Sequence, residues 1–363
     1  MNKGLYIHVP FCRQKCIYCD FYSLAENDHV VTESYKEAVI RNIKNCGYIF
    51  DTVYFGGGTP SLLSPTQVYD ILSSADIAPG AEISMEANPE TVTDDTLSGY
   101  RDAGVNRLSF GVQSFDDKEL KMLGRIHSAE TARNAVLSAH RFFDDISVDL
   151  MLGLPFSDAD SALASAEAAV SLPITHISAY MLKIEEGTPL SKRVDLINAT
   201  DDDRSAEQYE KIVPCLAENG FHQYEISNFC KPGHECRHNL KYWRCEEYLG
   251  VGPAAHSCID RKRYCVPSDT ARFISSEKQD IVYTDEDACT EEERFMLAMR
   301  LNEGYTADDR LLSAADVYIK SGFLELHGRN ISFTVKGMLV SNSIIAGLSD
   351  VIGGKDENRN CDT

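Results

Sequence analysis

The sequence is short of positive charge and has no long hydrophobic run. Its 363 residues include 35 lysines and arginines against 56 aspartates and glutamates, a formal net charge of −21. Phosphate backbones and anionic lipid surfaces bind local excesses of positive charge, so this composition argues against a nucleic-acid partner. The apolar runs are short, and the N-terminus MNKGLYIHVPFC lacks the apolar stretch of a signal peptide. We therefore expect a cytoplasmic protein without an integral membrane segment.

The sequence also lacks the cysteine density of a disulfide scaffold, since only 12 of its residues are cysteines. In a reducing compartment thiols serve as small apolar residues, metal ligands or redox groups. The hydrophobic content of 43% excludes intrinsic disorder as the general state of the chain. The spacing of the cysteines therefore has to decide what they do.

Short β-rich runs alternate with amphipathic helical patterns from residue 4 to about residue 190. The expected strands are Leu5–Val9, Thr52–Phe55, Ile83–Ala87, Arg107–Phe110, Ser147–Leu150 and His176–Met181. The expected helices between them are Ser34–Cys46, Pro65–Ala75, Asp94–Ala103, Ala129–Phe142 and Ala159–Ser171. Six successive βα units predict a parallel sheet with right-handed crossovers. Because six units are too few to close an eight-stranded barrel, we expect an open, TIM-like partial (β/α)6 barrel; a doubly wound sheet is the second interpretation.

The rest of the chain differs in composition. The stretch 222–268 is dense in Cys, His, Tyr and Gly and reads as irregular, and FLELHGRNISFT predicts a β-hairpin that turns at His327–Asn330. The C-terminal unit is winged-helix-like, and at this net charge we interpret it as a packing module. The predicted divisions are a partial barrel (1–200), a connecting region (201–289), a small winged-helix-like domain (290–350) and a disordered tail (351–363).

Cys12, Cys16 and Cys19 form a Cys-x3-Cys-x2-Cys set. Three thiolates this close together can enclose one metal centre. They could instead be buried or redox-active thiols, or bind zinc with His8 as the fourth ligand. A [4Fe–4S] cluster held by three thiolates would leave one iron open to a small molecule. That interpretation accounts for the absence of a fourth cysteine from residues 20–23, which are Asp, Phe, Tyr and Ser.

Further polar or glycine-rich candidates follow the predicted strands where each one ends. Gly56–Gly58 with Thr59 and Pro60 follow the second strand, and the later strands lead to Glu86, Asn88, Gln113, Ser114 and Asp149. Sites in parallel βα architectures assemble at the carboxyl ends of the strands, so these residues share one rim with the cysteine loop. Asp149 could instead cap a loop. Arg125 could reach an anionic group on this rim or be a solvated helix charge.

These motifs together resemble a known superfamily. YIHVPFCRQKCIYCDF, GGGTP, SMEANPE, FGVQSF and DLMLGLP are similar to the radical SAM superfamily and, more narrowly, to the oxygen-independent coproporphyrinogen III oxidases and their relatives. The resemblance implies a [4Fe–4S] cluster on Cys12, Cys16 and Cys19, and reductive cleavage of S-adenosylmethionine by the cofactors. It implies S-adenosylmethionine contacts from Tyr6, Tyr18, Gly57, Gly58, Thr59, Glu86, Gln113, Arg125 and Asp149.

Within that family the chain departs from the oxidases. They carry a fourth cysteine two positions after the third, where this chain has Phe21, and a longer N-terminal extension. The stretch HNLKYWRCEEYLGVGPAAHS at 238–257 resembles the signature of HemW-type heme chaperones instead. That resemblance implies heme as cargo with His238 as a ligand, apo-hemoproteins such as those of the respiratory chain as recipients, and dimerisation. The alternative is a radical SAM enzyme that oxidatively decarboxylates a porphyrinogen, so enzymatic activity stays open.

The residues of 238–257 permit two interpretations by themselves. His238, Trp243, Tyr242 and Tyr248 could hold a flat macrocycle, or Trp243 could anchor a packing motif in which His238 is hydrogen-bonded. Nearby thiols and an imidazole could bind a second metal, although their spacing matches no zinc pattern. These residues are Cys230, His234, Cys236 and Cys245, and Cys258 lies beside them without an assigned role.

Overall fold

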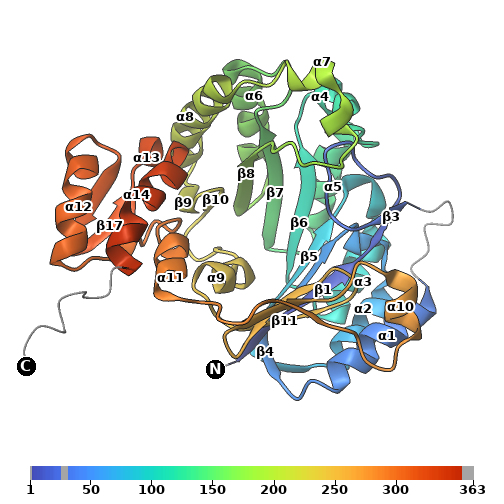
Figure 1. Ribbon diagram of the computed structural model, residues 1–363. Coiled ribbons are helices and arrows are strands. Elements are labelled where there is room, and N and C mark those ends of the chain that lie inside the picture. Colours follow the sequence, from blue (N-terminus) through green and yellow to red (C-terminus); the bar gives the residue numbers. More distant parts are fainter. Residues whose placement is uncertain (1, 26–31, 354–363) are drawn as a thin grey trace, which may run out of the picture.

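The computed structural model describes residues 2–25 and 32–353 of the chain. A twelve-stranded sheet, in the order β14-β13-β12-β11-β1-β4-β5-β6-β7-β8-β10-β9, runs through it (Figure 1). Its centre is the predicted set of six parallel strands: β1 (Lys3–Val9), β4 (Ile49–Gly57), β5 (Asp76–Ala87), β6 (Arg107–Gln113), β7 (Asp145–Leu152) and β8 (His176–Met181). The predicted open (β/α)6 arrangement is confirmed.

Helices on the outer side of the curved sheet connect the parallel strands (Figure 1). Capping residues determine where these helices begin and end. Ser64 and Gln67 form a capping box at the start of α2, and Gly104 ends α3 with a φ of 110°. The sequence did not predict α4, which is only two turns long. The helices are α1 (Glu33–Lys44), α2 (Pro65–Leu72), α3 (Asp94–Ala103), α4 (Asp117–Leu123), α5 (Ala129–Ala139), α6 (Ala159–Val170), α7 (Val194–Ile197) and α8 (Asp202–Glu218).

The stretch 222–268 is not irregular, and that expectation is wrong. It contains β9 (His222–Glu225), β10 (Asn228–Cys230), α9 (Arg237–Trp243), β11 (Tyr248–Val251), β12 (His256–Ile259) and β13 (Lys262–Cys265), and α10 (Thr270–Ser275) and β14 (Val282–Asp285) follow. β11 pairs in parallel with β1, where Leu249 lies opposite Leu5. β11 is four residues long, and its partner β1 is more than 200 residues away. Its pairing is therefore invisible in local periodicity.

The C-terminal lobe packs helices against a small sheet in the order β15-β17-β16. The predicted hairpin is confirmed, because His327 pairs with Asn330 at its turn. α14 continues to Gly353, beyond the boundary predicted at residue 350, and residues 354–363 of the predicted tail lie outside the described residues. The elements are α11 (Glu291–Ala298), β15 (Tyr305–Thr306), α12 (Asp309–Lys320), β16 (Leu324–His327), β17 (Asn330–Phe333), α13 (Val335–Leu339) and α14 (Ser341–Gly353).

One cluster of buried apolar side chains extends from Leu5 in β1 to Leu348 in α14. The lobe and the sheet therefore share a continuous core. None of the helices in the described part of the chain is long and apolar enough to cross a membrane.

Candidate functional site

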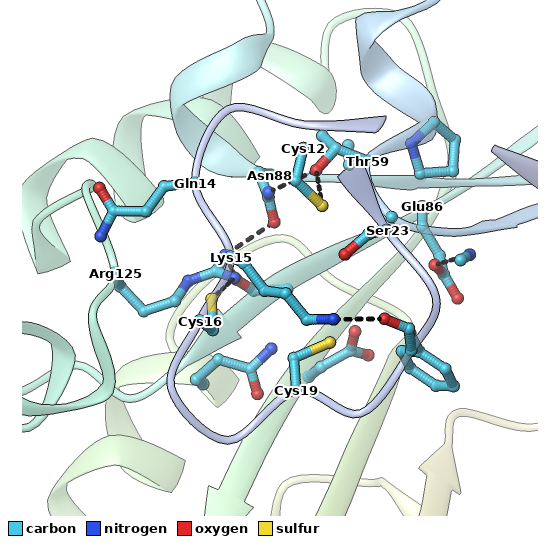
Figure 2. A pocket seen from close by; sticks show the side chains of 18 of the residues that line it. Cys12, Gln14, Lys15, Cys16, Cys19, Ser23, Thr59, Glu86, Asn88 and Arg125 are labelled. Carbon is cyan, nitrogen blue, oxygen red and sulfur yellow. Dashed lines mark hydrogen bonds between the residues drawn. The ribbon is translucent and has the colours of Figure 1, made fainter. Parts of the chain in front are cut away.

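The loop after β1 presents three sulfur atoms to the space that it encloses. Cys12, Cys16 and Cys19 all point into this space (Figure 2) and line a cavity of about 140 Å³. The loop begins in β2 (Phe11–Cys12), which pairs with β3 (Leu24–Ala25), so both of its ends are held. Burial raises the pKa of Cys19 to about 11. Three thiols on one short loop are a donor set that iron or zinc would bind as thiolates.

The glycine run after β4 lets a second loop pack against the cysteine loop. The Gly58 and Thr59 amides donate to the carbonyls of Val9 (2.8 Å) and Phe11 (2.7 Å). A Cβ on Gly58 would lie 2.7 Å from the Phe11 carbonyl oxygen, and one on Gly57 would lie 2.6 Å from the His8 ring. Only glycine permits this approach. The run therefore positions the rim of the cavity, and Gly57, Gly58 and Thr59 all line it.

Two half-buried carboxyl groups, Glu86 and Asp149, face the same cavity from β5 and β7. Glu86 accepts hydrogen bonds from the Tyr54 hydroxyl (2.9 Å) and the Gly57 amide (3.2 Å), and Asp149 accepts from Ser109 (3.0 Å). Burial, reinforced by the charge of Asp149, raises the pKa of Glu86 to about 7, and burial also raises the pKa of Asp149. A cationic ligand in the cavity would lower the pKa values of both carboxyl groups, because it would stabilise the ionised carboxylates.

Arg125 reaches this rim rather than solvent. Its guanidinium donates to Asn88 Oδ1 (2.7 Å), to the Gly111 carbonyl (2.5 Å) and to Cys16 Sγ (3.5 Å). Asn88 in turn donates to Thr59 Oγ1 (3.1 Å), whose hydroxyl donates to Cys12 Sγ (3.5 Å). This network connects the cysteine loop to the ends of three strands (Figure 2). It also holds a positive group where a ligand carboxylate could meet it.

The remaining predicted residues divide between two cavities. Gln113 has a φ of 73°, and its side chain accepts a hydrogen bond from Tyr180 (2.6 Å). Both residues and Tyr18 line the cavity beside the cysteines. Tyr180, which the sequence reading missed, ends β8 and could have been found by the strand-end rule that selected Glu86. Tyr6 lines a neighbouring cavity instead, and its hydroxyl bonds to His8 Nδ1 (3.1 Å).

That neighbouring cavity is larger, about 680 Å³, and shares Phe21, Gly57 and Glu86 with the first. Its walls are rich in aromatic rings from β1, the cysteine loop and the 238–257 segment. They include Tyr6, Tyr22, Tyr54, Tyr242, Tyr248 and His256. We call it the aromatic cavity. Of the four residues that the sequence suggested for a flat macrocycle, Tyr242 and Tyr248 line this cavity, whereas His238 and Trp243 do not.

His238 lies behind the wall of the aromatic cavity. It is completely buried, with Nδ1 hydrogen-bonded to Thr52 Oγ1 (2.8 Å) and Nε2 to the Tyr242 hydroxyl (2.8 Å). Burial lowers the pKa of His238 to about 3, so the imidazole is neutral at physiological pH. In this conformation both ring nitrogens are engaged. Trp243 does not line this cavity; the wall is formed by Tyr242 and Tyr248.

The four cysteine and histidine residues proposed for a second metal do not converge. Cys236 faces Glu82 (3.6 Å), and His234 lies beside Asp145 (3.5 Å). Cys245 lies at the far end of α9, next to Cys289. The unassigned Cys258 joins that second group, with 3.8 Å between its sulfur and that of Cys289.

The chain is similar to known proteins over most of its length. Residues 6–168 match the radical SAM superfamily. The chain is 35% identical to the heme chaperone HemW of Escherichia coli, over 94% of this chain and 97% of that one, and 35% identical to that of Mycobacterium tuberculosis, over 94% and 93%. The radical SAM enzyme coproporphyrinogen III oxidase (HemN) from Escherichia coli shares the fold, with a TM-score of 0.81 at 19% identity over 96% of this chain and 90% of that one. The chain therefore belongs to the radical SAM superfamily and, within it, to the HemW family of heme chaperones.

Proposed function

We propose that this protein binds heme and passes it to apo-hemoproteins, on a scaffold that holds a [4Fe–4S] cluster and S-adenosylmethionine. One observation carries the proposal: the thiol-lined cavity and the aromatic cavity share a wall at Phe21, Gly57 and Glu86. The superfamily implies the cluster and S-adenosylmethionine. The aromatic cavity supplies a place for a flat macrocycle beside them, and the relatives' name supports heme as its occupant.

The thiol-lined cavity suits the cluster and S-adenosylmethionine by its donor set. Cys12, Cys16 and Cys19 would hold the cluster and leave one iron open to the ligand. Glu86 and Asp149 would face the cationic groups of S-adenosylmethionine, and Arg125 would face its carboxylate. Gly57, Gly58, Thr59, Gln113 and Tyr18 would line its remaining surface, while Tyr6 acts from the aromatic cavity. When bound, the pair supplies reductive cleavage to a 5′-deoxyadenosyl radical.

His238 is the proposed heme ligand, and Tyr242 controls its access. The two residues lie four positions apart on α9, so they share one face of the helix. With Nδ1–H donated to Thr52, Nε2 keeps its lone pair and accepts from the Tyr242 hydroxyl; this tautomer is our assignment. A hydrogen-bonded Nδ1–H is the arrangement that orients histidine ligands of metals. Withdrawal of the Tyr242 side chain would expose Nε2 to the aromatic cavity.

Heme titration of anaerobically reconstituted protein tests this proposal. We expect the Soret band of bound heme in the wild type, strong weakening in His238→Ala, and transfer of heme to an apo-cytochrome. His256→Ala is the matched control, because His256 is an exposed imidazole on the same cavity. Loss of binding in His256→Ala but not in His238→Ala would move the ligand to β12. Absence of heme binding in the wild type would end the proposal.

A second candidate function is oxidative decarboxylation of a porphyrinogen. A third cavity, about 370 Å³, adjoins Cys19 and is lined by Arg107 and Lys183, whose positive charges suit substrate carboxylates. Four carboxyl groups line it as well, those of Asp20, Glu86, Asp149 and Glu185. The likeness to coproporphyrinogen III oxidase is one of fold at 19% identity. Anaerobic turnover of coproporphyrinogen III without heme binding would favour this candidate. Recipients in the respiratory chain, a homodimer, a cytoplasmic location and the absence of a nucleic-acid partner stay predictions of the sequence.

A further inference from the structure

A second group of thiols lies outside both cavities. Cys245, Cys289 and Glu293 each offer a ligand atom, and these atoms all lie within 4.8 Å of one another. The sulfur of Cys258 lies 3.8 Å from that of Cys289. Cys258 and Cys289 are buried, and Cys245 and Glu293 are half-buried. We call these four residues the thiol corner.

The four ligands of the thiol corner come from three parts of the chain. Cys245 follows the C-terminus of α9, Cys258 lies in β12, Cys289 precedes the α11 N-cap Thr290, and Glu293 is in the first turn of α11. Cys245 and Cys289 have φ values of 53° and 60°, a conformation that costs non-glycine residues about 1 kcal/mol or more. Strained non-glycine residues cluster at functional sites, and the sulfur atoms of these two cysteines lie within 4.8 Å of each other, which points to a site.

The ligand atoms of Cys245, Cys289 and Glu293 lie close enough together for one tetrahedral ion. Cys258 lies outside that trio and qualifies as a fourth ligand through its distance to Cys289. Zinc binds cysteine sulfur at about 2.3 Å, so two sulfurs on a tetrahedral zinc lie about 3.8 Å apart. Cys258 and Cys289 already have this separation, whereas a disulfide requires about 2.05 Å. We propose that Cys245, Cys258, Cys289 and Glu293 bind one divalent zinc-class ion, as a structural site separate from the iron–sulfur cluster.

The surroundings compensate the charge of such a site. Three thiolates and a carboxylate exceed the charge of one divalent ion by two negative charges. Arg263 pairs with Glu293 Oε1, and Arg294 follows Glu293 and donates from Nε to the Cys289 carbonyl (3.1 Å). Glu293 Oε2 accepts from the Cys289 amide (2.6 Å) and keeps a second lone pair for a metal. Burial raises the pKa of Cys245 and of Cys258 to about 12, so metal binding must release thiol protons to solvent.

The site would join elements that are far apart in sequence. It would fix the C-terminus of α9, the helix of His238 and Tyr242, to β12 and to the start of α11. α11 packs against α14 of the C-terminal lobe. A bound ion would therefore stabilise the end of α9 opposite the proposed heme ligand. This inference does not depend on heme binding.

Metal titration of the full chain tests the proposal. Cys12→Ala, Cys16→Ala and Cys19→Ala are combined first, so that the cysteine loop cannot bind the probe. Co²⁺ is added anaerobically, and zinc then displaces it. We expect about one Co²⁺ per chain with the thiolate charge-transfer and tetrahedral d–d bands of a cysteine-rich site. Cys289→Ser and Cys258→Ser in this background should abolish the bands, and Cys215→Ser, on α8, should leave them unchanged.

The outcomes separate the alternatives. Absence of the cobalt bands in the background protein overturns the proposal, as does their survival in both Cys289→Ser and Cys258→Ser. Recovery of a Cys258–Cys289 disulfide from anaerobically purified protein, without metal, also overturns it. Since a serine at a buried position could unfold the chain, the half-buried Cys245→Ser is measured as well, with circular dichroism as the folding control. Weakening of the bands in folded Cys245→Ser supports the site.

Discussion

The cysteine loop and the thiol corner bring thiols together in opposite ways. Cys12, Cys16 and Cys19 lie within eight residues, and their neighbours on the rim come from successive parallel strands. The thiol corner gathers residues from 245 to 293 across α9, β12 and α11. The spacing of the cysteines in the sequence indicates the first site. The second forms only because β11 and β12 extend the sheet beyond β1. A metal site can therefore be proposed where the sequence shows no closely spaced ligand motif.

Cys16→Ala is expected to have the largest effect, because it removes one of the three proposed cluster ligands. Iron bound on anaerobic reconstitution should fall from about four per chain to almost none, with loss of the brown absorption. Zinc at the thiol corner should be unchanged. Cys46→Ala, at the end of α1, is the matched control. Iron retained in Cys16→Ala but lost in Cys289→Ser would reverse the assignment of the two sites.

Glu86→Gln tests the electrostatics of the thiol-lined cavity. Glu86 has an ordinary pKa of 4.5 and a folded-state pKa of about 7, so its favourable contribution is complete below about pH 4.5 and is lost as the pH rises through 7. Glu86→Gln should therefore stabilise the cofactor-free chain at pH 8 by up to about 3 kcal/mol, and by almost nothing at pH 4.5. Urea unfolding at the two pH values measures this difference.

The control for this pH effect is Glu130→Gln, at an exposed position of α5. It should change stability little at either pH. Equal stabilisation by Glu86→Gln at both pH values would show that packing, and not ionisation, is responsible. Glu86→Gln should also weaken S-adenosylmethionine binding, since it removes the carboxylate that we propose as a partner of the ligand's cationic groups.

The sequence predicted the features that depend on local pattern, namely the parallel strands and the polar residues at their ends. Strand ends selected Glu86, Gln113 and Asp149, and the structure brings these residues to one cavity. The sequence did not predict β11, since this four-residue run pairs with β1 only through long-range packing. Nor could the sequence place His238 behind Tyr242, because the burial of a side chain depends on neighbours such as Thr52 in β4. Motif spacing is local, whereas burial and sheet edges are properties of the whole fold.

Gly58→Ala tests whether close packing of two loops, rather than the thiols alone, defines the first site. The added Cβ would meet the Phe11 and Val9 carbonyl oxygens at 2.7 and 2.8 Å, so the loops must separate at a cost of about 2 kcal/mol. Chemical unfolding should show this loss, and iron content should fall with it. Gly80→Ala, where the Cβ has open space but φ is 73°, should cost about 1 kcal/mol and leave iron unchanged. Equal iron loss in both variants would contradict this role.

Tyr242→Phe should have the smallest effect, and it addresses α9, the element that links the two regions. Its hydroxyl bonds to His238 Nε2, and Cys245 of the thiol corner lies three residues further along. Removal of the hydroxyl frees His238 Nε2 and leaves the ring in place. Heme bound at the proposed ligand Nε2 then no longer has to break the hydrogen bond from Tyr242, which is worth about 1 kcal/mol. Heme affinity should rise about fivefold in equilibrium titration. Tyr248→Phe, on the same cavity, should leave it unchanged, and weaker binding in Tyr242→Phe would mean that the hydroxyl contacts heme itself.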